Sequence, residues 1–117
     1  MYSFLATQSL ELALGGAVSA NELQVTGCYV DITIATMAMS AITAISAQSN
    51  GAGTVTIVAA PGAGVVRVLK ELTVYNKDTA NATVNISYND NGTVRQVVKA
   101  VMPTLYSINY NDNSGWK

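Results

Sequence analysis

The side chains of this chain that could take part in catalysis are seven carboxylates, one cysteine and numerous serines and threonines. The chain contains no histidine, so the commonest general base and the commonest metal ligand are both missing. A serine or threonine nucleophile needs a base to remove its proton, and carboxylate catalysis needs two acidic residues at facing positions. Because neither arrangement is recognisable, the sequence predicts no catalytic residues and no enzymatic activity.

Three of the acidic residues, Asp78, Asp90 and Asp112, lie in polar segments between apolar runs. Aspartate is common there because its carboxylate bonds to nearby backbone. Residues 89–92 and 111–113 resemble fragments of a calcium loop, but neither has the D-x-[DN]-x-[DN]-G pattern followed by a glutamate. We interpret both as turns and predict no metal site, with weak cation binding by turn oxygens as the alternative.

Two further features could suggest a reactive or cofactor-binding site. Cys28 lies in VTGCYVDI, which has no basic residue to lower the thiol pKa, so we expect a small buried apolar side chain. A single cysteine also cannot form an internal disulfide. The Pro-Gly-Ala-Gly run at 61–64 lacks the G-K-[ST] ending of a phosphate-binding loop, so it predicts a turn and no bound cofactor.

Composition limits the possible partners. The 117 residues suffice for one domain, with 50% hydrophobic residues, 11% charged residues and a net charge of −1. Lys and Arg do not cluster, which argues against binding to nucleic acid or to an anionic membrane. Residues 1–16 lack the basic region of a secretion signal, and the uncharged run at 32–66 is too rich in Thr, Ser, Asn and Gly for a membrane span. A weakly charged surface suits a chain that packs against other proteins.

Seven short segments alternate apolar and polar residues, with turns every 8–12 residues. This spacing predicts an all-β fold: a single-domain antiparallel β-sandwich or small barrel of about seven short strands, spanning residues 1–117. Asn91-Gly92 is the strongest hairpin signal, because both positions tolerate positive φ. The segments are 9–14, 23–34, 53–60, 65–76, 83–88, 93–102 and 106–110.

Two of these segments have irregular apolar faces. In 23–34 the face changes parity at Gly27, which predicts a β-bulge there. In 65–76 the face is interrupted by Lys70, whose ammonium could reach solvent at a sheet edge or contact a partner. The apolar members of that second face are Val66, Val68, Leu72 and Val74.

Residues 35–53 allow three interpretations. Ala and Met favour a helix, in which Met37, Ala41, Ala44 and Ile45 would form a stripe. The interleaved Thr and Ile residues favour strand instead. The third possibility is a flexible or partner-contacting arm.

The second half of the chain combines several distinctive features. They are Ala59-Ala60-Pro61, Arg67 with Lys70, the turn of Tyr75, Asn76, Asp78 and Thr79, the NDNGT hairpin at 89–93, Val98-Lys99-Ala100 and Gly115-Trp116. In these features the chain from residue 59 onward resembles a module of small structural proteins from tailed bacteriophages, and residues 9–33 are similar to the N-terminal strand pair of such proteins. The resemblance leaves out residues 35–53, and it departs from the expected Gly-Asp or Gly-Glu turn after Pro103, where Thr104-Leu105 stands.

The resemblance implies a virion structural protein, made in the cytoplasm of the bacterial host. We expect a capsid decoration (cement) protein that binds and stabilises the major capsid protein shell as a homo-oligomer, with a trimer favoured. Neither nucleic acid nor a membrane is an expected partner. A tail, neck or fibre-adapter protein is the first alternative. A carbohydrate-binding β-sandwich module that uses Tyr106, Tyr110 and Trp116 is the alternative from another class.

Overall fold

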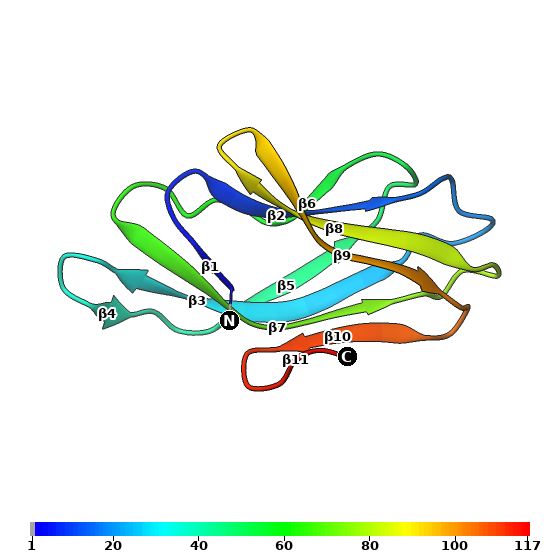
Figure 1. The fold of residues 1–117 in the computed structure, drawn as a ribbon. Helices are drawn as coiled ribbons and strands as arrows, with labels where there is room; N and C mark the ends of the chain where they lie inside the picture. The colour runs from blue at the N-terminus through cyan, green and yellow to red at the C-terminus, as the bar shows by residue number, and fades with distance from the viewer. Residues whose placement is uncertain (1) are drawn as a thin grey trace.

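The computed structural model describes residues 2–117, which form eleven strands in two antiparallel sheets packed face to face (Figure 1). The all-β prediction is confirmed, as a sandwich. The four-stranded sheet has the order β6 (Val55–Val58), β2 (Gln8–Leu14), β8 (Ala82–Asp90), β9 (Thr93–Met102). The seven-stranded sheet contains β1 (Tyr2–Phe4), β3 (Gln24–Thr33), β4 (Ala38–Met39), β5 (Thr43–Gln48), β7 (Val65–Tyr75), β10 (Ser107–Asn111) and β11 (Gly115–Trp116).

The core lies between the two sheets. Successive side chains of a strand point to opposite faces, so Leu10, Leu12 and Leu14 of β2 are all buried, as the alternation at 9–14 predicts. Each fully buried large apolar side chain stabilises the fold by roughly 1.5–3 kcal/mol. The core residues are Phe4, Leu10, Leu12, Leu14, Leu23, Val25, Ile45, Ile57, Val58, Leu69, Leu72, Val74, Val84, Ile86, Met102 and Tyr110.

The pairing of β3 with β7 contains the bulge, but not where the sequence places it. Cys28 pairs with Glu71 and Tyr29 pairs with Leu69, so Lys70 is the extra residue and the bulge belongs to β7. The prediction of a bulge at Gly27 is therefore wrong. Gly27 is needed for another reason: a Cβ there would lie 2.2 Å from the carbonyl oxygen of Glu71.

The bulge also changes which residues of β7 face the core. Leu69 and Leu72 both point inward, although they are three residues apart, because Lys70 adds one residue between them. Val66 and Val68 consequently lie on the outer face, so the predicted common face of β7 is wrong. The Lys70 ammonium forms an ion pair with Asp112, with Nζ and Oδ2 2.6 Å apart.

The uncertain segment at 35–53 contains strands and no helix. β4 pairs with Ile32 and Thr33, and β5 pairs with β3 along all six of its residues. Met37, a member of the predicted helical stripe, lies in the turn before β4 with a φ of 55°. The strand interpretation therefore holds for β4 and β5.

The predicted hairpin at Asn91-Gly92 is confirmed. Asp90 pairs with Thr93, so Asn91 and Gly92 form the whole turn, and their φ values are 51° and 95°. The Gly92 N–H donates to Asn89 Oδ1 at 2.8 Å. Positive φ at both central residues is the mark of the turn type that suits the twist of a hairpin.

We expect Gly92→Val to destabilise the fold by about 1–3 kcal/mol, because a β-branched residue resists positive φ. In a domain of this size that corresponds to a melting temperature lower by roughly 4–15 °C, measured by circular dichroism. Gly16→Val is the matched control, since an added Cβ meets no atom within 4 Å at either glycine and only Gly92 has positive φ. An equal fall in melting temperature in the two variants would contradict the turn assignment.

Candidate interaction surface

The three turn aspartates make structural contacts, mostly with residues distant in sequence, whereas the turn interpretation predicts bonds to nearby backbone. Asp112 pairs with Lys70, and Asp90 accepts a hydrogen bond from Gln8 Nε2 at 3.2 Å. Asp78 accepts four backbone N–H groups, described below. Within residues 2–117, no group of three or more Cys, Asp or Glu side chains could hold a metal ion.

Asp78 fastens two loops together at one end of the sandwich. It is only 2% exposed, and its carboxylate accepts the N–H groups of Ser19, Ala20, Asn21 and Thr79 at 2.8–3.1 Å. The bond from Ser19 is the largest cause that lowers the pKa of Asp78 to about 2, against the opposing effect of burial. Residues 19–21 are far from Asp78 in sequence, so no local pattern could reveal this contact.

Asn76 extends the same network to β9. Its side chain is fully buried, and Oδ1 accepts the Asp78 N–H at 3.0 Å. Nδ2 donates to the carbonyl oxygens of Ala80 and Met102, at 3.1 and 2.9 Å. Every polar atom of this amide therefore helps to fix loop backbone.

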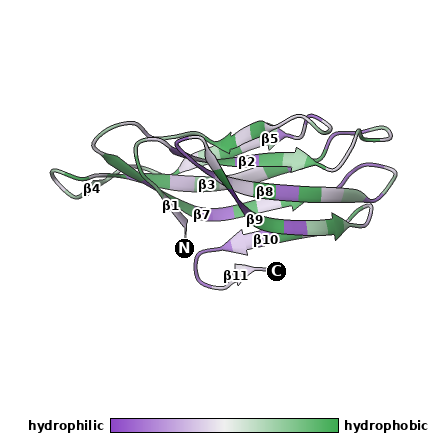
Figure 2. Cartoon of the chain, turned by 45° about the horizontal axis from the view of Figure 1, so that its top comes forward, coloured by the Kyte–Doolittle hydropathy of each residue, from purple (hydrophilic) through white to green (hydrophobic). Residues whose placement is uncertain are grey.

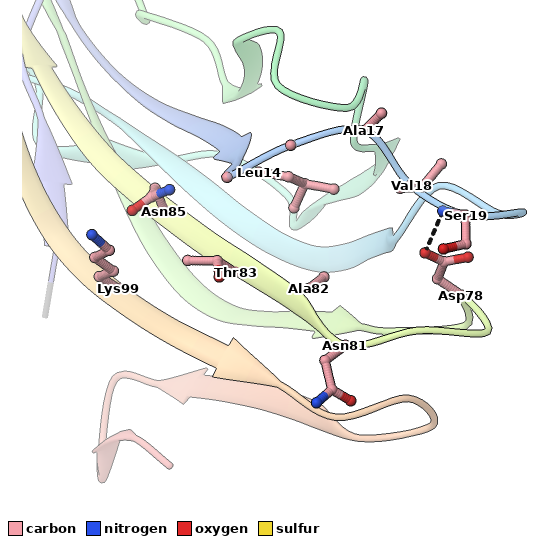
Figure 3. Close-up of a pocket in the computed structure, with 12 residues that line it drawn as sticks. Leu14, Ala17, Val18, Ser19, Asp78, Asn81, Ala82, Thr83, Asn85 and Lys99 are labelled. Atoms are coloured by element: carbon pink, nitrogen blue, oxygen red, sulfur yellow. Dashed lines mark hydrogen bonds between the residues drawn. The ribbon is translucent and has the colours of Figure 1, made fainter.

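A cleft of about 300 Å³ lies beside Asp78, under the loop that follows β2 (Figure 3). Figure 3 shows Asp78 turned toward the Ser19 backbone, with Asn85 and Lys99 farther along the cleft on β8 and β9. The Asp78 oxygens already accept backbone N–H groups, and among the described residues no hydrogen bond joins Lys99 to the Ser19 or Thr83 hydroxyl of the lining. We therefore do not assign the cleft a chemical role.

The aromatic residues do not form one exposed platform. Tyr110 is buried, and its ring centroid lies 5.2 Å from that of Trp116 and 5.0 Å from that of Tyr2. Trp116 Nε1 donates to the Tyr2 hydroxyl at 3.0 Å, so this cluster joins the two ends of the described chain. Tyr106 is 64% exposed and lies outside the cluster, just before β10.

Cys28 is half-buried, whereas the sequence analysis expects it to be buried. It lies on the outer face of the seven-stranded sheet, with Sγ 3.8 Å from Glu71 Oε1. Partial burial and the neighbouring Glu71 charge raise the pKa of the thiol. The thiol is therefore protonated at neutral pH, which disfavours reactivity.

The surface best suited to a partner is the hairpin between β3 and β5. All residues from 33 to 44 are exposed, and none is charged. Of nine exposed large apolar side chains among residues 2–117, four lie in this short segment. We call them the hairpin patch: Ile34, Met37, Met39 and Ile42.

The hairpin forms one end of the elongated molecule, whose longest dimension is 47 Å (Figure 1). In Figure 2 its turn again forms that end, beside the β4 label. Met37 and Met39 are 73% and 66% exposed. Met37 also has positive φ, a conformation that costs a non-glycine residue free energy.

The base of the hairpin is firmly attached to the sheet. Ile32 pairs with Met39 on one side and with Val66 on the other. The Ile34 N–H donates to the Gly64 carbonyl oxygen at 2.9 Å, in the loop formed by residues 61–64. Next to them, Val30 and Val68 are buried on the outer face, separate from the main core. The exposed apolar side chains therefore continue a buried apolar base.

The two charges nearest to the hairpin neutralise each other. Arg67 donates from Nε and Nη2 to the Asp31 carboxylate, at 2.9 and 3.2 Å. This bond to Asp31 raises the pKa of Arg67. The guanidinium also lies 4.2 Å from the ring centroid of Tyr29 and donates to the Ala59 carbonyl oxygen. The hairpin end of the molecule thus presents no unpaired charge from these two residues.

Comparison with known proteins gives no relative: no family model, curated protein or solved structure matches the chain. Among residues 2–117 there is also no helix of the length and apolarity needed to cross a membrane.

We expect Asp78→Asn to lower stability at neutral pH, because the amide cannot accept the same four N–H groups as a charged carboxylate. The pKa of Asp78 is about 2 in the folded chain, below its ordinary value of 3.8. The carboxylate therefore stabilises the fold above about pH 4, and this contribution is lost as the pH falls toward 2. Thermal unfolding should show a difference in melting temperature between wild type and variant that shrinks as the pH is lowered from 7 to 2.

Asp90→Asn is the matched control, since Asp90 accepts only one side-chain bond, from Gln8. We expect its melting temperature to follow that of the wild type at every pH. A difference between wild type and Asp78→Asn that stays constant from pH 7 to pH 2 would contradict the proposed role of the charge.

Proposed function

We propose that this chain is a non-enzymatic structural protein of a tailed-bacteriophage virion. More specifically, we propose a capsid decoration protein that binds the major capsid protein shell as a homo-oligomer and stabilises it. The proposal has two supports: the resemblance of residues 9–33 and 59–116 to phage structural proteins, and the hairpin patch. The patch is the observation that carries it.

The hairpin patch has the composition of the centre of a protein interface. Such centres are depleted in charged residues and enriched in methionine and aromatic residues. Burying an unpaired charge is costly, whereas the uncharged hairpin can be covered without that cost. Methionine is flexible and polarizable, so Met37 and Met39 can adapt to the irregular surface where capsid subunits meet.

Binding of this kind would stabilise a shell by mass action. A protein that binds the assembled shell, and not its dissociated subunits, shifts the equilibrium toward assembly. The sandwich would serve as a rigid support that holds the hairpin in place. Because the patch lies outside the main core, its side chains are available for a partner without loss of folding energy.

We expect the double variant Met37→Gln, Met39→Gln to bind capsids at least about tenfold more weakly than the wild type. Burying one methionine contributes roughly 1.5–3 kcal/mol, and 1.4 kcal/mol corresponds to a factor of ten. The measurement is co-sedimentation with shells of the major capsid protein that lack this chain. The melting temperature of the double variant should stay close to that of the wild type, because the Met37 and Met39 side chains are both exposed.

The control is Val94→Thr, Val101→Thr, which makes two other exposed apolar side chains of β9 more polar. We expect this control to bind like the wild type. Co-sedimentation with isolated tails tests the tail-adapter alternative in parallel. Binding to tails and not to shells would overturn the decoration proposal, and equal binding by both double variants would remove the hairpin patch from it.

A further inference from the structure

The outer edge of β5 lacks the features that normally keep a sheet edge from pairing. Exposed edges present unpaired N–H and C=O groups, and proteins protect them with charges, proline, bulges or short strands. β5 has six residues, TAISAQ, with neither charge nor proline. Its register with β3 runs without a shift from Gln24–Gln48 to Tyr29–Thr43.

The other edges of the described sandwich are protected. β9 contains Arg95 and Lys99, and the shift in its register with β8 leaves Val97 as an extra residue. β6 has four residues and is followed closely by Pro61. β1 has three residues, and β4 and β11 have two each.

The hydrogen bonds at the end of β5 show which backbone groups are free. The Ser49 N–H donates to the Leu23 carbonyl oxygen at 2.9 Å, and the Leu23 N–H donates to Ser49 Oγ at 2.8 Å, so Ser49 directs its N–H toward β3 as a residue of a hydrogen-bonded pair does. Such pairs alternate along an antiparallel ladder. Residues 43, 45 and 47 therefore bond to β3, and the N–H and C=O groups of Ala44, Ser46 and Gln48 point away from the sheet.

We propose that this edge pairs with the β5 edge of a second copy of the chain, antiparallel and about a two-fold axis at Ser46. Ser46 would face Ser46 of the other copy, and Ala44 would face Gln48. The three facing pairs would form about six main-chain hydrogen bonds, two for each pair. Such an interface is isologous, because both copies use the same surface.

A second copy suits this edge for reasons of charge and size. Residues 32–66 contain no charged side chain, so two identical segments meet without like-charge repulsion. The flanking Asp31 and Arg67 are paired within each chain. Gln48, the longest of the three outward residues, would face Ala44, which has the shortest side chain.

The pairing leaves the hairpin patch free. The hairpin precedes β5 in sequence, so an antiparallel pair places the two hairpins at opposite ends of the joined strands. The inference does not depend on the proposed virion function. It does predict a two-fold pair, in place of the trimer expected from the resemblance.

The test uses opposite charges at the two-fold axis, with mass measured by analytical ultracentrifugation. We expect the wild type to sediment as a dimer of the 12.2 kDa chain. Ser46→Lys and Ser46→Asp should each raise the dimer dissociation constant by roughly two- to fivefold, because two like charges would meet at the axis. An equimolar mixture of the two variants should restore the dimer, because lysine then faces aspartate.

Two further variants separate loss of pairing from loss of folding. Ser46→Pro removes an outward N–H without breaking a bond to β3, so we expect a folded monomer. Ser107→Lys places the same charge on the outer face of β10, away from the edge, and should leave the dimer intact. Circular dichroism checks that each variant keeps its sheet content.

Three outcomes would overturn the proposal. The first is a wild-type chain that remains monomeric at the highest soluble concentration. This outcome includes a monomer whose β5 amides become protected only when capsid shells are added. The second is a stable trimer, or a dimer dissociation constant in Ser46→Lys alone that equals that of the wild type. The third is a mixture of the lysine and aspartate variants that remains monomeric, because the two-fold register through Ser46 requires the rescue.

Discussion

The close approach of β7 to Gly27 is the constraint on which the rest of the structure depends. A side chain at Gly27 would collide with the Glu71 carbonyl oxygen, 2.2 Å from the Cβ position, so only glycine lets β3 and β7 pair here. β1 and β10 pair with β7, and β4 and β5 pair with β3. The larger sheet, including the hairpin and the free edge, is therefore built on this one pair.

Local patterns predicted the fold wherever the buried face of a strand alternates without a bulge. The alternation of β2 and the Asn91-Gly92 turn were readable because burial and positive φ each demand particular residue types. The bulge at Lys70 could not be located from the sequence, because an extra residue in β7 and an extra residue in β3 produce the same change of parity between the paired strands. β4 and β5 were ambiguous since their residues are mostly exposed, which leaves little alternation to detect.

The candidate surface was only partly predictable for the same reason. The lack of charge between Asp31 and Arg67 singled out residues 35–53 as a place for partner contacts, but it could not distinguish helix, strand and arm. Pairing with β3 makes the segment strand, and within it Ile45 and Ser49 are buried and Ala47 packs against the core. The apolar side chains at Ile34, Met37, Met39 and Ile42 are exposed. The Asp78 network was not predictable, because it joins residues about sixty positions apart through backbone N–H groups that have no sequence signature.

Stability and contact surfaces are separated along the molecule. Asp78 and Asn76 direct a buried carboxylate and a buried amide to loop backbone, so these loops are fixed from within. The side-chain bonds to backbone within the hairpin, made by Ser40 and Thr36, are exposed, and Met37 adopts a conformation that costs free energy. A change at the hairpin therefore affects binding more than folding, whereas a change at Asp78 affects folding first. An uncharged edge and an exposed apolar hairpin are liabilities in an isolated chain, and they become stabilising contacts only when another protein surface covers them.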